Sequence, residues 1–414
     1  MRADGQKSRW NANRQGHRRT GCDVMGAPGY KVLVAGGVIG RFGRFVDRSL
    51  IDIAVPVVRD ALAAVGLDAA DIQAVFVGNA FGGSIVGQES ILAQILLAPA
   101  GIDGVPMHTV KNACSSGSDA VHLAHSSIAF GQYDCVLALG AEKLTHTDRA
   151  RAFTALASAT DHPPVGEGRS VFMDVNATRA LNYMQKYGAQ PKHFAKIAVK
   201  NRKHGSLNER AAERTELTVE AVLADKVIVP PLTRSMCGGI VDGAACAILV
   251  SEDFAARRGL TGTSFIVSSS VVSGVPEGDA KGNATHRAGL AAYIDAGIDP
   301  KDVSVAEVHD PSSPQEFFDI EDLMLCGRGE AIKLAEQDDT SLGGRIPVNT
   351  SGGLTSRGHP VGATGVAQIL EIHEQLTGRA GPRQVKGAKV GLAQMAGGLL
   401  GKDSAFATVH LLSV

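Results

Sequence analysis

The chain has 414 residues, more than one typical hydrophobic core holds, so its length predicts two or three domains. Its 41 basic and 42 acidic side chains nearly cancel, which excludes the strong global field of a protein that binds nucleic acid or an anionic membrane. With 44% hydrophobic residues, 49 glycines and 5% aromatic residues, the composition is typical of a soluble α/β protein.

The six cysteines are scattered and show neither a CxxC pair nor the spacing of a metal site. We therefore expect no bound metal and a reducing compartment, the cytoplasm. No apolar run is long enough to span a membrane, so neither a membrane nor nucleic acid is expected as a partner.

Residues 1–24 carry several basic side chains, few acids and no apolar periodicity. Two interpretations fit this composition. A transit peptide is typically rich in arginine and poor in acids, whereas a disordered leader would precede a functional start at Met25. We favour the disordered leader.

From residue 30 onward, strand-like and helix-like segments alternate. The ranges 31–35, 72–77 and 135–139 are apolar and short, as strands are, and 50–65 has the apolar spacing of a helix. Because strands that are buried on both faces and separated by helices form parallel sheets, the sequence predicts an α/β fold with a mostly parallel sheet.

Cys114 stands between an extended segment, 105–110, and a helix that ends at Gly131. A thiol at a helix N-terminus meets unpaired N–H groups and the positive end of the helix dipole, which favour a thiolate. Its small neighbours leave room for a substrate carbon, so Cys114 is a candidate nucleophile. The alternative is a buried cysteine packed under the helix.

The range 144–234 interrupts the alternation, because it is polar and has the pattern of helices and loops. We interpret it as an inserted loop domain. Beyond it, 303–308 is a predicted strand, and 313–316 (SPQE) predicts a helix start with a capping box and a proline at the first position. Here Glu316 is interpreted as a helix cap.

The two halves of the chain share a short pattern. Residues 236–240 (MCGGI) and 395–399 (MAGGL) each lie beside an apolar strand, and we interpret both as hairpins. A glycine-rich segment, 352–365, leads into a further helix in the second half. The shared pattern predicts an internal duplication.

Three further elements could converge on Cys114. His359 lies in a glycine-rich Gly-His-Pro turn and could deprotonate the thiol. His309 ends a predicted strand, where ligands gather in open α/β sheets. It could donate to a thioester carbonyl or act as an acid or base, with Asp310 either orienting it or serving as a turn residue. The N–H groups of Gly397 and its neighbour could form an oxyanion hole.

Four ordered segments resemble the thiolase superfamily, and most of all the sterol-carrier-protein type of 3-ketoacyl-CoA thiolase without its lipid-transfer domain. They are 112–117 (NACSSG), 309–310 (HD), 349–365 (NTSGGLTSRGHPVGATG) and 397–398 (GG). The resemblance implies a five-layered αβαβα fold from two similar halves plus the inserted loop domain. It also implies a homodimer or tetramer, with coenzyme A as co-substrate and no tightly bound cofactor.

The resemblance divides the chain after the leader into an N-terminal half (25–143 with 235–272), a loop domain (144–234) and a C-terminal half (273–414). It implies that the loop domain contacts coenzyme A. The candidates there for binding its phosphates are Lys200, Arg202, Lys203 and His204.

The resemblance also implies a role for each candidate residue. Cys114 would take the acyl group as a thioester, and His359 would activate it. His309 would replace an asparagine of other thiolases beside the oxyanion site. Gly397 and the N–H of Cys114 would polarise the acyl carbonyl.

One departure from the family pattern concerns the second cysteine, which serves as acid and base for the substrate α-carbon. Its two usual places hold Met395 and Pro311, which we assign to the substrate pocket and which carry no proton at neutral pH. His309 or a water molecule would then take the missing acid/base role.

Three functions stay open on the sequence alone. The first is a thiolase-type acyltransferase on acyl-CoA or 3-ketoacyl-CoA, in lipid or sterol side-chain metabolism. The second is a non-thiolytic relative that works with a small OB-fold partner, by acyl transfer to another acceptor, decarboxylative condensation or retro-aldol cleavage. The third is a non-catalytic scaffold that binds acyl-CoA.

Overall fold

The computed structural model describes residues 30–163 and 170–414, so the expected leader at 1–24 lies outside the described residues. The first half of the chain alternates strands and helices, as predicted. Its main elements are β1 (Val32–Ile39), α1 (Leu50–Val65), β2 (Ala74–Gly78), α2 (Gly82–Val86), α3 (Leu92–Leu97), β3 (Met107–Val110), α4 (Ser116–Ala129), β4 (Cys135–Glu142), β7 (Gly243–Ser251) and α9 (Glu252–Arg258).

The region between β4 and β7 is mostly helical, with one short hairpin in addition. Its elements are α5 (Ala150–Ala157), α6 (Val171–Tyr187), α7 (Pro191–Ser206), α8 (Val219–Ala224), β5 (Val227–Val229) and β6 (Leu232–Thr233). Helices and loops were expected here, while the domain boundaries themselves stay a prediction.

The second half repeats the alternation. Its elements are β8 (Ser264–Ser273), α10 (Ala284–Ala296), β9 (Val305–Glu307), α11 (Ser313–Asp322), α12 (Ala331–Glu336), α13 (Gly353–Ser356), α14 (Val361–Leu376), β10 (Val390–Leu400) and β11 (Asp403–Ser413). None of the described helices is long and apolar enough to cross a membrane.

Helix α1 shows how the local sequence sets the ends of an element. Ser49 caps its start by accepting a hydrogen bond from Asp52 N (3.2 Å), and the Asp52 carboxylate accepts from Ser49 N (2.9 Å). Gly66 ends the helix in the left-handed region at φ 72°, which costs glycine little. Such signals explain why the predicted bounds of this helix coincide with the observed ones.

The strands form one nine-stranded sheet in the order β3-β2-β4-β7-β1-β8-β11-β10-β9. In the first half, β2 is parallel to β4, which is antiparallel to β7, and β7 is antiparallel to β1. In the second half, β9, β10, β11 and β8 repeat this order and these directions. The topology therefore contains the internal duplication that the sequence predicted, joined where β1 pairs with β8.

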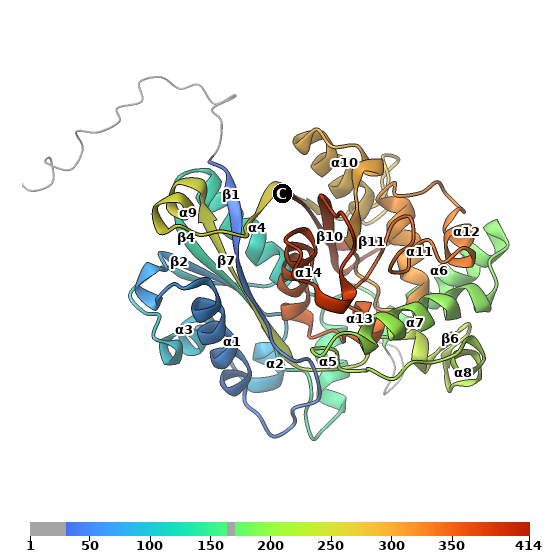
Figure 1. Ribbon diagram of the computed structural model, residues 1–414. Coiled ribbons are helices and arrows are strands. Elements are labelled where there is room, and N and C mark those ends of the chain that lie inside the picture. The colour runs from blue at the N-terminus through green and yellow to red at the C-terminus, as the bar shows by residue number, and fades with distance from the viewer. Residues whose placement is uncertain (1–29, 164–169) are drawn as a thin grey trace, which may run out of the picture.

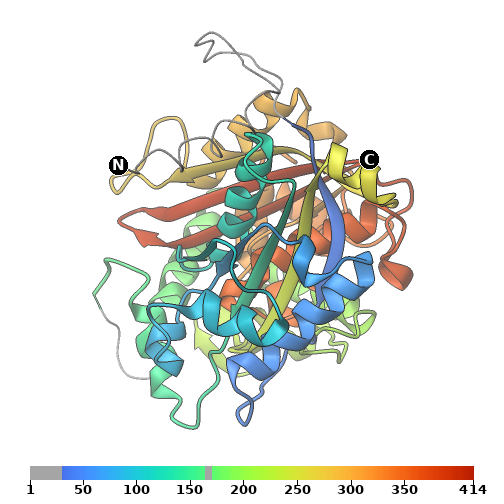
Figure 2. The ribbon, with the colours of Figure 1, turned by 90° about the vertical axis from the view of Figure 1, so that its left-hand side faces the viewer.

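The elements stack in five layers (Figure 1). Helices α1 and α3 cover the outer face of the first-half strands, and α10 covers the second half. Helices α4 and α14 pack on each other between the two sets of strands, and α14 contacts both β4 and β10. Figure 2 shows the second-half strands running across those of the first half. The predicted αβαβα architecture is confirmed.

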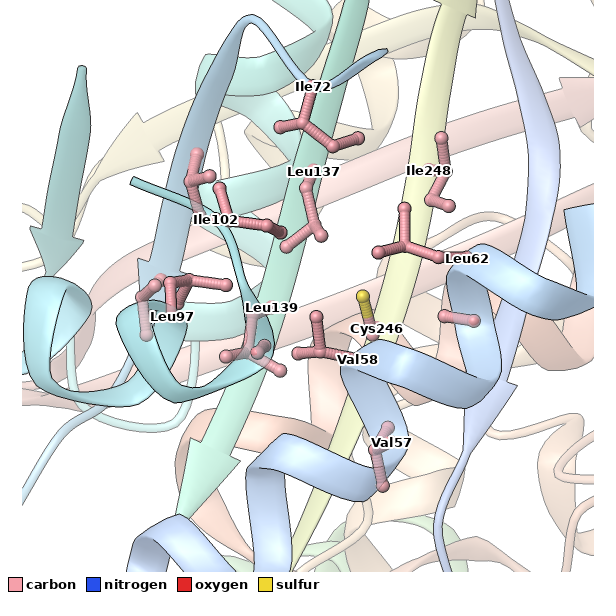
Figure 3. Packing of buried hydrophobic residues seen from close by; sticks show 14 of the residues in the cluster. Val57, Val58, Leu62, Ile72, Leu97, Ile102, Leu137, Leu139, Cys246 and Ile248 are labelled. Atoms are coloured by element: carbon pink, nitrogen blue, oxygen red, sulfur yellow. The ribbon is translucent and has the colours of Figure 1, made fainter. Parts of the chain in front are cut away.

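Alternating side chains of β4 point into two different layers, as the period of a strand requires. Leu137 and Leu139 pack with Val58 and Leu62 of α1 in the outer core (Figure 3). Val136, one position away, packs instead in the inner core that contains α4 and α14. Because both faces are apolar, β4 can lie only in the middle of the layered fold.

Two sequence interpretations of local structure were wrong. Helix α11 begins at Ser313 with Pro314 in its first turn, but its N-cap is Ser312 and no side chain caps it. Glu316 is therefore not a cap. Its buried carboxylate accepts hydrogen bonds from Lys200 Nζ and from Asn349 Nδ2 (3.0 Å), which the sequence could not reveal because both partners are distant in the chain.

Only the second of the two Met-x-Gly-Gly segments belongs to a hairpin, in which β10 and β11 pair antiparallel across a turn at residues 401–402. Residues 395–399 lie inside β10, where Gly398 adopts φ 66° and interrupts the pairing with β11. Residues 236–240 instead end a short 3-10 turn and continue as a loop. The duplication thus rests on the strand order and not on these segments.

Candidate active site

Cys114 lies in a tight turn between β3 and α4, as predicted. Ala113 adopts φ 48°, a left-handed conformation that is uncommon for a residue with a side chain. Ser116 holds the turn, because its Oγ accepts from Asn112 N (2.9 Å) and donates to Ala113 O (2.7 Å). Strain of this kind is typical of functional sites, where the surrounding structure fixes it.

The Cys114 thiol faces a pocket of about 460 Å³ between the two halves and the 144–234 region. His309, His359 and Pro311 line the same pocket. Its other walls are mainly apolar and include Phe81, Leu144, Phe153, Leu156, Phe172, Met173, Ile240 and Leu399. Three predicted catalytic residues from distant parts of the sequence therefore meet in one cavity.

His309 is placed by its backbone N–H, which donates to Gln394 Oε1 (2.9 Å), and by Asn349, which holds the residues before it. Asn349 Oδ1 accepts from Val308 N (2.9 Å), and Asn349 N donates to Ala306 O (2.8 Å), so the loop after residue 348 is fastened to the end of β9. Asp310 does not orient His309 through a hydrogen bond. Its carboxylate accepts from Asn201 Nδ2 (2.7 Å) and Leu354 N (2.8 Å), which fixes the loop that carries His359.

His359 is held by the first turn of α14. The Thr364 hydroxyl donates to Pro360 O (2.9 Å) and lies 2.8 Å from His359 Nδ1. Because the hydroxyl hydrogen is used, Thr364 Oγ1 accepts the Nδ1–H of His359. This assigns the lone pair to Nε2, a buried atom with no hydrogen-bond partner among the described residues. His359 is thus prepared to accept a proton.

The reactive atoms form one cluster. The Cys114 sulfur and one ring nitrogen each of His309 and His359 all lie within 4.8 Å of one another. The centroids of the two imidazole rings are 5.2 Å apart, and the ring planes cross at 64°. A thiol and two imidazoles at this spacing also suit a metal ion such as zinc, which the sequence did not indicate.

Burial keeps the cluster uncharged. Desolvation raises the pKa of the Cys114 thiol to about 12, and the nearby Glu142 carboxylate acts in the same direction. Desolvation, His309 and Arg357 hold the pKa of His359 well below its usual range, and desolvation lowers the pKa of His309 to about 3. At neutral pH the pair is therefore a thiol beside a neutral imidazole. The helix N-terminus alone does not produce the thiolate that the sequence suggested.

Glu142 is a buried residue of this site that the sequence did not single out. Its carboxylate accepts from the N–H groups of Ala80 (2.9 Å), Phe81 (3.2 Å) and Gly362 (3.0 Å). It thereby ties the end of β4 to the start of α14, and burial raises its pKa to about 7. No motif marks Glu142, because all its partners are distant in sequence.

The glycines of β10 approach the Cys114 turn closely. A Cβ at Gly397 would lie 2.1 Å from Asn112 O, so only glycine fits there. The N–H of the next residue, Gly398, points to the Cys114 sulfur and lowers the thiol pKa, against the effect of burial. An oxyanion role for Gly397 and for the Cys114 N–H stays a prediction.

The predicted coenzyme A contacts on α7 do not reach the pocket. Lys200 is buried and pairs with Glu316, and His204 is buried between Asn349 O (3.0 Å) and Leu342 N (3.1 Å). The remaining two, Arg202 and Lys203, do not line the pocket either, and Arg202 pairs with Glu213. The assignment is corrected for Lys200 and His204 and stays a prediction for Arg202 and Lys203, while the cations that line the cavity are Arg179, Lys226 and Arg234.

The two positions where the family pattern would place a second cysteine, 311 and 395, differ in their surroundings. Pro311 lines the pocket, as assigned, but Met395 is fully buried in β10 opposite Thr408 and does not. The pocket contains another thiol, Cys237, which the sequence had left among the scattered cysteines. Cys237 pairs with Ser312 in an isolated β-bridge, and Gly238 N donates to Pro311 O (2.9 Å).

Comparison with known proteins identifies the family. The thiolase N-terminal domain matches residues 32–222, and the thiolase C-terminal domain-like family matches residues 270–409. The acetyl-CoA acetyltransferase of Methanothermobacter thermautotrophicus is 35% identical over 92% of this chain and 99% of that protein. The chain belongs to the thiolase family.

Other thiolase-family relatives match at similar identity. Human sterol carrier protein 2 is 33% identical over 87% of this chain and 69% of that protein. The benzoylsuccinyl-CoA thiolase subunit BbsB of Thauera aromatica is 33% identical over 89% of this chain and 95% of that protein. This thiolase-family protein is accordingly an acyltransferase.

Two solved structures share the thiolase-family fold. The Ltp2-ChsH2(DUF35) aldolase has a TM-score of 0.77 at 21% identity, covering 94% of this chain and 99% of that one. Human mitochondrial 3-ketoacyl-CoA thiolase has a TM-score of 0.70 at 19% identity, also over 94% and 99%. At these identities the comparison concerns the fold alone.

Proposed function

We propose that this acyltransferase works on acyl-CoA and 3-ketoacyl-CoA thioesters through an acyl thioester on Cys114. The observation that carries the proposal is the cluster of Cys114, His309 and His359 within 4.8 Å at the wall of an apolar pocket. The fixed Nδ1–H of His359 supports its role as the base.

In the first half-reaction, Cys114 Sγ attacks the thioester carbonyl while its proton passes to His359 Nε2. Transfer between two neutral groups avoids placing a free thiolate in the buried site. The N–H groups of Cys114 and Gly397 and the imidazole of His309 stabilise the oxyanion. When the intermediate collapses, the bond from carbon to the coenzyme A sulfur breaks, and His359 returns the proton to that sulfur.

We propose Cys237 as the proton carrier for the substrate α-carbon. Its thiol lines the pocket and donates to Thr233 O (3.4 Å), so it is protonated at rest. Its backbone lies against residues 311 and 312, beside the position that Pro311 occupies. In the cleavage direction, the bond between the α-carbon and the β-carbonyl carbon breaks, and Cys237 would protonate the released α-carbon.

Lys226 and Arg234 are our candidates for the coenzyme A phosphates. Both are exposed, flank the β5–β6 hairpin and line the open side of the pocket. They replace Lys200 and His204 of α7 in this role. Coenzyme A would thus act as co-substrate, with no tightly bound cofactor.

The remaining expectations are proposals that rest on the thiolase resemblance. The apolar pocket wall supports an acyl group with an apolar body, as in lipid or sterol side-chain metabolism. We further propose a cytoplasmic homodimer or tetramer. Light scattering of the purified chain would test the assembly, and a monomeric mass would contradict it.

A second candidate function keeps the acyl-Cys114 step but replaces thiolysis, with a small OB-fold protein as partner. Pro311 supports this second candidate, because it lines the pocket at a usual place of the acid/base cysteine and its side chain cannot transfer a proton. A scaffold without catalysis is the third candidate. The unpartnered Nε2 of His359 facing the thiol argues for catalysis instead.

Two assays on a set of variants separate these candidates. One follows the mass of the acylated protein, and the other follows thiolysis of acetoacetyl-CoA. We expect Cys114→Ser to abolish both activities. Cys237→Ser should leave acylation in place and lower thiolysis about 10²–10⁴-fold, the usual contribution of general acid–base catalysis.

A chelator provides a control for these two assays, and two other outcomes would contradict the proposed function. A chelator should change neither activity, because the cluster acts as nucleophile and base and not as a metal site. Acylation without thiolysis in the unmodified protein would favour the non-thiolytic candidate. Absence of both activities with intact fold would favour the scaffold.

A further inference from the structure

An arginine that forms no ion pair with the described residues lines the mainly apolar pocket. Arg179 of α6 is partly buried, and its one side-chain hydrogen bond among the described residues is a long contact from Nη2 to Lys402 O (3.5 Å). Within 30–163 and 170–414, no carboxylate oxygen lies within 4.0 Å of its guanidinium nitrogens. A guanidinium that is partly withdrawn from water and unpaired is costly unless an anion joins it.

The position of Arg179 differs from that of the other two cations of the pocket. Lys226 and Arg234 are exposed beside the β5–β6 hairpin, and Arg234 pairs with Asp225 (3.3 Å). Arg179 lies instead against the turn that follows β10, the strand that carries the glycines next to Cys114.

The same face of α6 approaches the segment that carries His309. Asn176, one turn before Arg179, accepts from Ser312 Oγ (2.8 Å) and also lines the pocket. Phe172 and Met173 continue this face as apolar wall. Arg179 therefore shares a face of α6 with apolar residues of the pocket wall, which is the kind of surface that an acyl group would contact, whereas the two exposed cations lie beside the β5–β6 hairpin.

The charge of Arg179 acts on the buried carboxyl group of Asp319 without forming an ion pair with it. Asp319 of α11 accepts from Gln315 Nε2 (2.9 Å) through Oδ1, and its Oδ2 has no partner among the described residues. If Arg179 served this carboxylate, a direct pair would be expected, since a guanidinium matches a carboxylate in a bidentate geometry. The charge of Arg179 is left for a ligand.

We propose that Arg179 binds a carboxylate at the distal end of the acyl group, so that the protein selects CoA thioesters whose acyl chain has an apolar body and a second carboxylate. This inference rests on the proposed acyl-Cys114 chemistry. It adds to that chemistry the substrate class, which the apolar wall and the single unpaired guanidinium together define.

The test compares two thioesters of equal acyl length, glutaryl-CoA and pentanoyl-CoA, which differ by the terminal carboxylate. The readout is the second-order rate constant for Cys114 acylation, measured by intact mass. We expect the unmodified protein to prefer glutaryl-CoA about 10–100-fold, the range of a charge-assisted hydrogen bond. In Arg179→Gln this ratio should fall toward one, and Arg179→Lys should retain part of it.

Lys226→Gln is the matched control, because it should slow both thioesters alike and keep their ratio. The proposal is overturned if the unmodified protein shows no preference for glutaryl-CoA. It is also overturned if Arg179→Gln slows both thioesters equally, which would make Arg179 a coenzyme A contact, or lowers only stability, which would make it a partner of Asp319. Failure of the proposed function looks different, since neither thioester would then modify Cys114.

Discussion

At the scale of single residues, the reactivity of Cys114 depends on a partner and not on its own ionisation. A thiol with a pKa near 12 is almost entirely protonated at neutral pH. The neutral His359, fixed with its lone pair toward the cluster, supplies the base at the moment of attack. A neutral pair also needs no counter-ion in a desolvated pocket.

This electrostatic arrangement predicts the pH dependence of Cys114 alkylation by iodoacetamide. Alkylation requires the thiolate, and burial holds the pKa of the thiol near 12. The rate should therefore be slow at pH 7 and rise about tenfold per pH unit through pH 9, by mass spectrometry of the Cys114 peptide.

Cys114→Ser provides the background from the other thiols in that experiment, and circular dichroism at each pH confirms that the protein stays folded. A rate that levels off between pH 6 and pH 8 would show a thiolate paired with a charged His359. That result would contradict the neutral pair.

Residues such as Glu142, Cys237 and Arg179 mark the limit of sequence reasoning at this scale. The motifs identified Cys114 and His359, because glycine-rich turns surround both. Glu142 and Arg179 lie in a regular strand and a regular helix, and only the packing of distant segments brings Glu142 near Cys114 and Arg179 to the pocket. Lys200 and His204 of α7 were misassigned for the same reason, since burial is not visible in a charge pattern.

At the scale of elements, the site depends on the close approach of α4 and α14. A Cβ at Gly117 in the first turn of α4 would lie 2.3 Å from Gly362 O in the first turn of α14. A Cβ at Gly140 of β4 would lie 2.5 Å from the same oxygen. Glycine thus allows the helix that follows Cys114 and the helix that follows His359 to meet backbone to backbone.

We predict that Gly117→Ala destabilises the protein, although the same change in an open helix stabilises it by about 0.5–1 kcal/mol. The clash is with backbone, and moving α14 would displace His359. The free energy of unfolding in urea should fall by about 1–3 kcal/mol, the usual cost of overpacking, and Cys114 acylation should slow.

Gly289→Ala in α10 is the matched control, because its Cβ would meet only the end of the Leu323 side chain, at 3.0 Å. That side chain can turn aside, so the control should lose less stability and keep the acylation rate. Equal effects of the two substitutions would contradict the role of the α4–α14 contact.

At the scale of the whole molecule, the duplication explains how the site is assembled. Helices α4 and α14 occupy equivalent places in the two halves. Helix α4 precedes β4 in the chain, and α14 precedes β10, which holds the matching place in the strand order. The two-fold repeat brings their N-terminal ends together, and each end carries one reactive residue, Cys114 or His359. His309, at the end of β9, completes the cluster from a third segment.

The succession of strands and helices was predictable, because the apolar patterns of β1, α1 and β4 are local and strong. The prediction of a mostly parallel sheet was wrong, because β1 pairs antiparallel with β7 and β8, β4 with β7, and β11 with β8 and β10. The strand order was not predictable, since only one of the two Met-x-Gly-Gly segments belongs to a hairpin and the pairing of β1 with β8 leaves no local signal. The prediction of five αβαβα layers came from the resemblance to thiolases, because hydrophobic periodicity alone does not predict how the elements stack.

The measurement that tests the central claim most directly is the mass of the Cys114 peptide after brief incubation with an acyl-CoA. We predict a mass increase equal to the acyl group on that peptide alone, with release of one coenzyme A per adduct. The adduct should be absent in Cys114→Ser and form far more slowly in His359→Gln. An adduct on another residue, or coenzyme A release that persists in Cys114→Ser, would contradict the account.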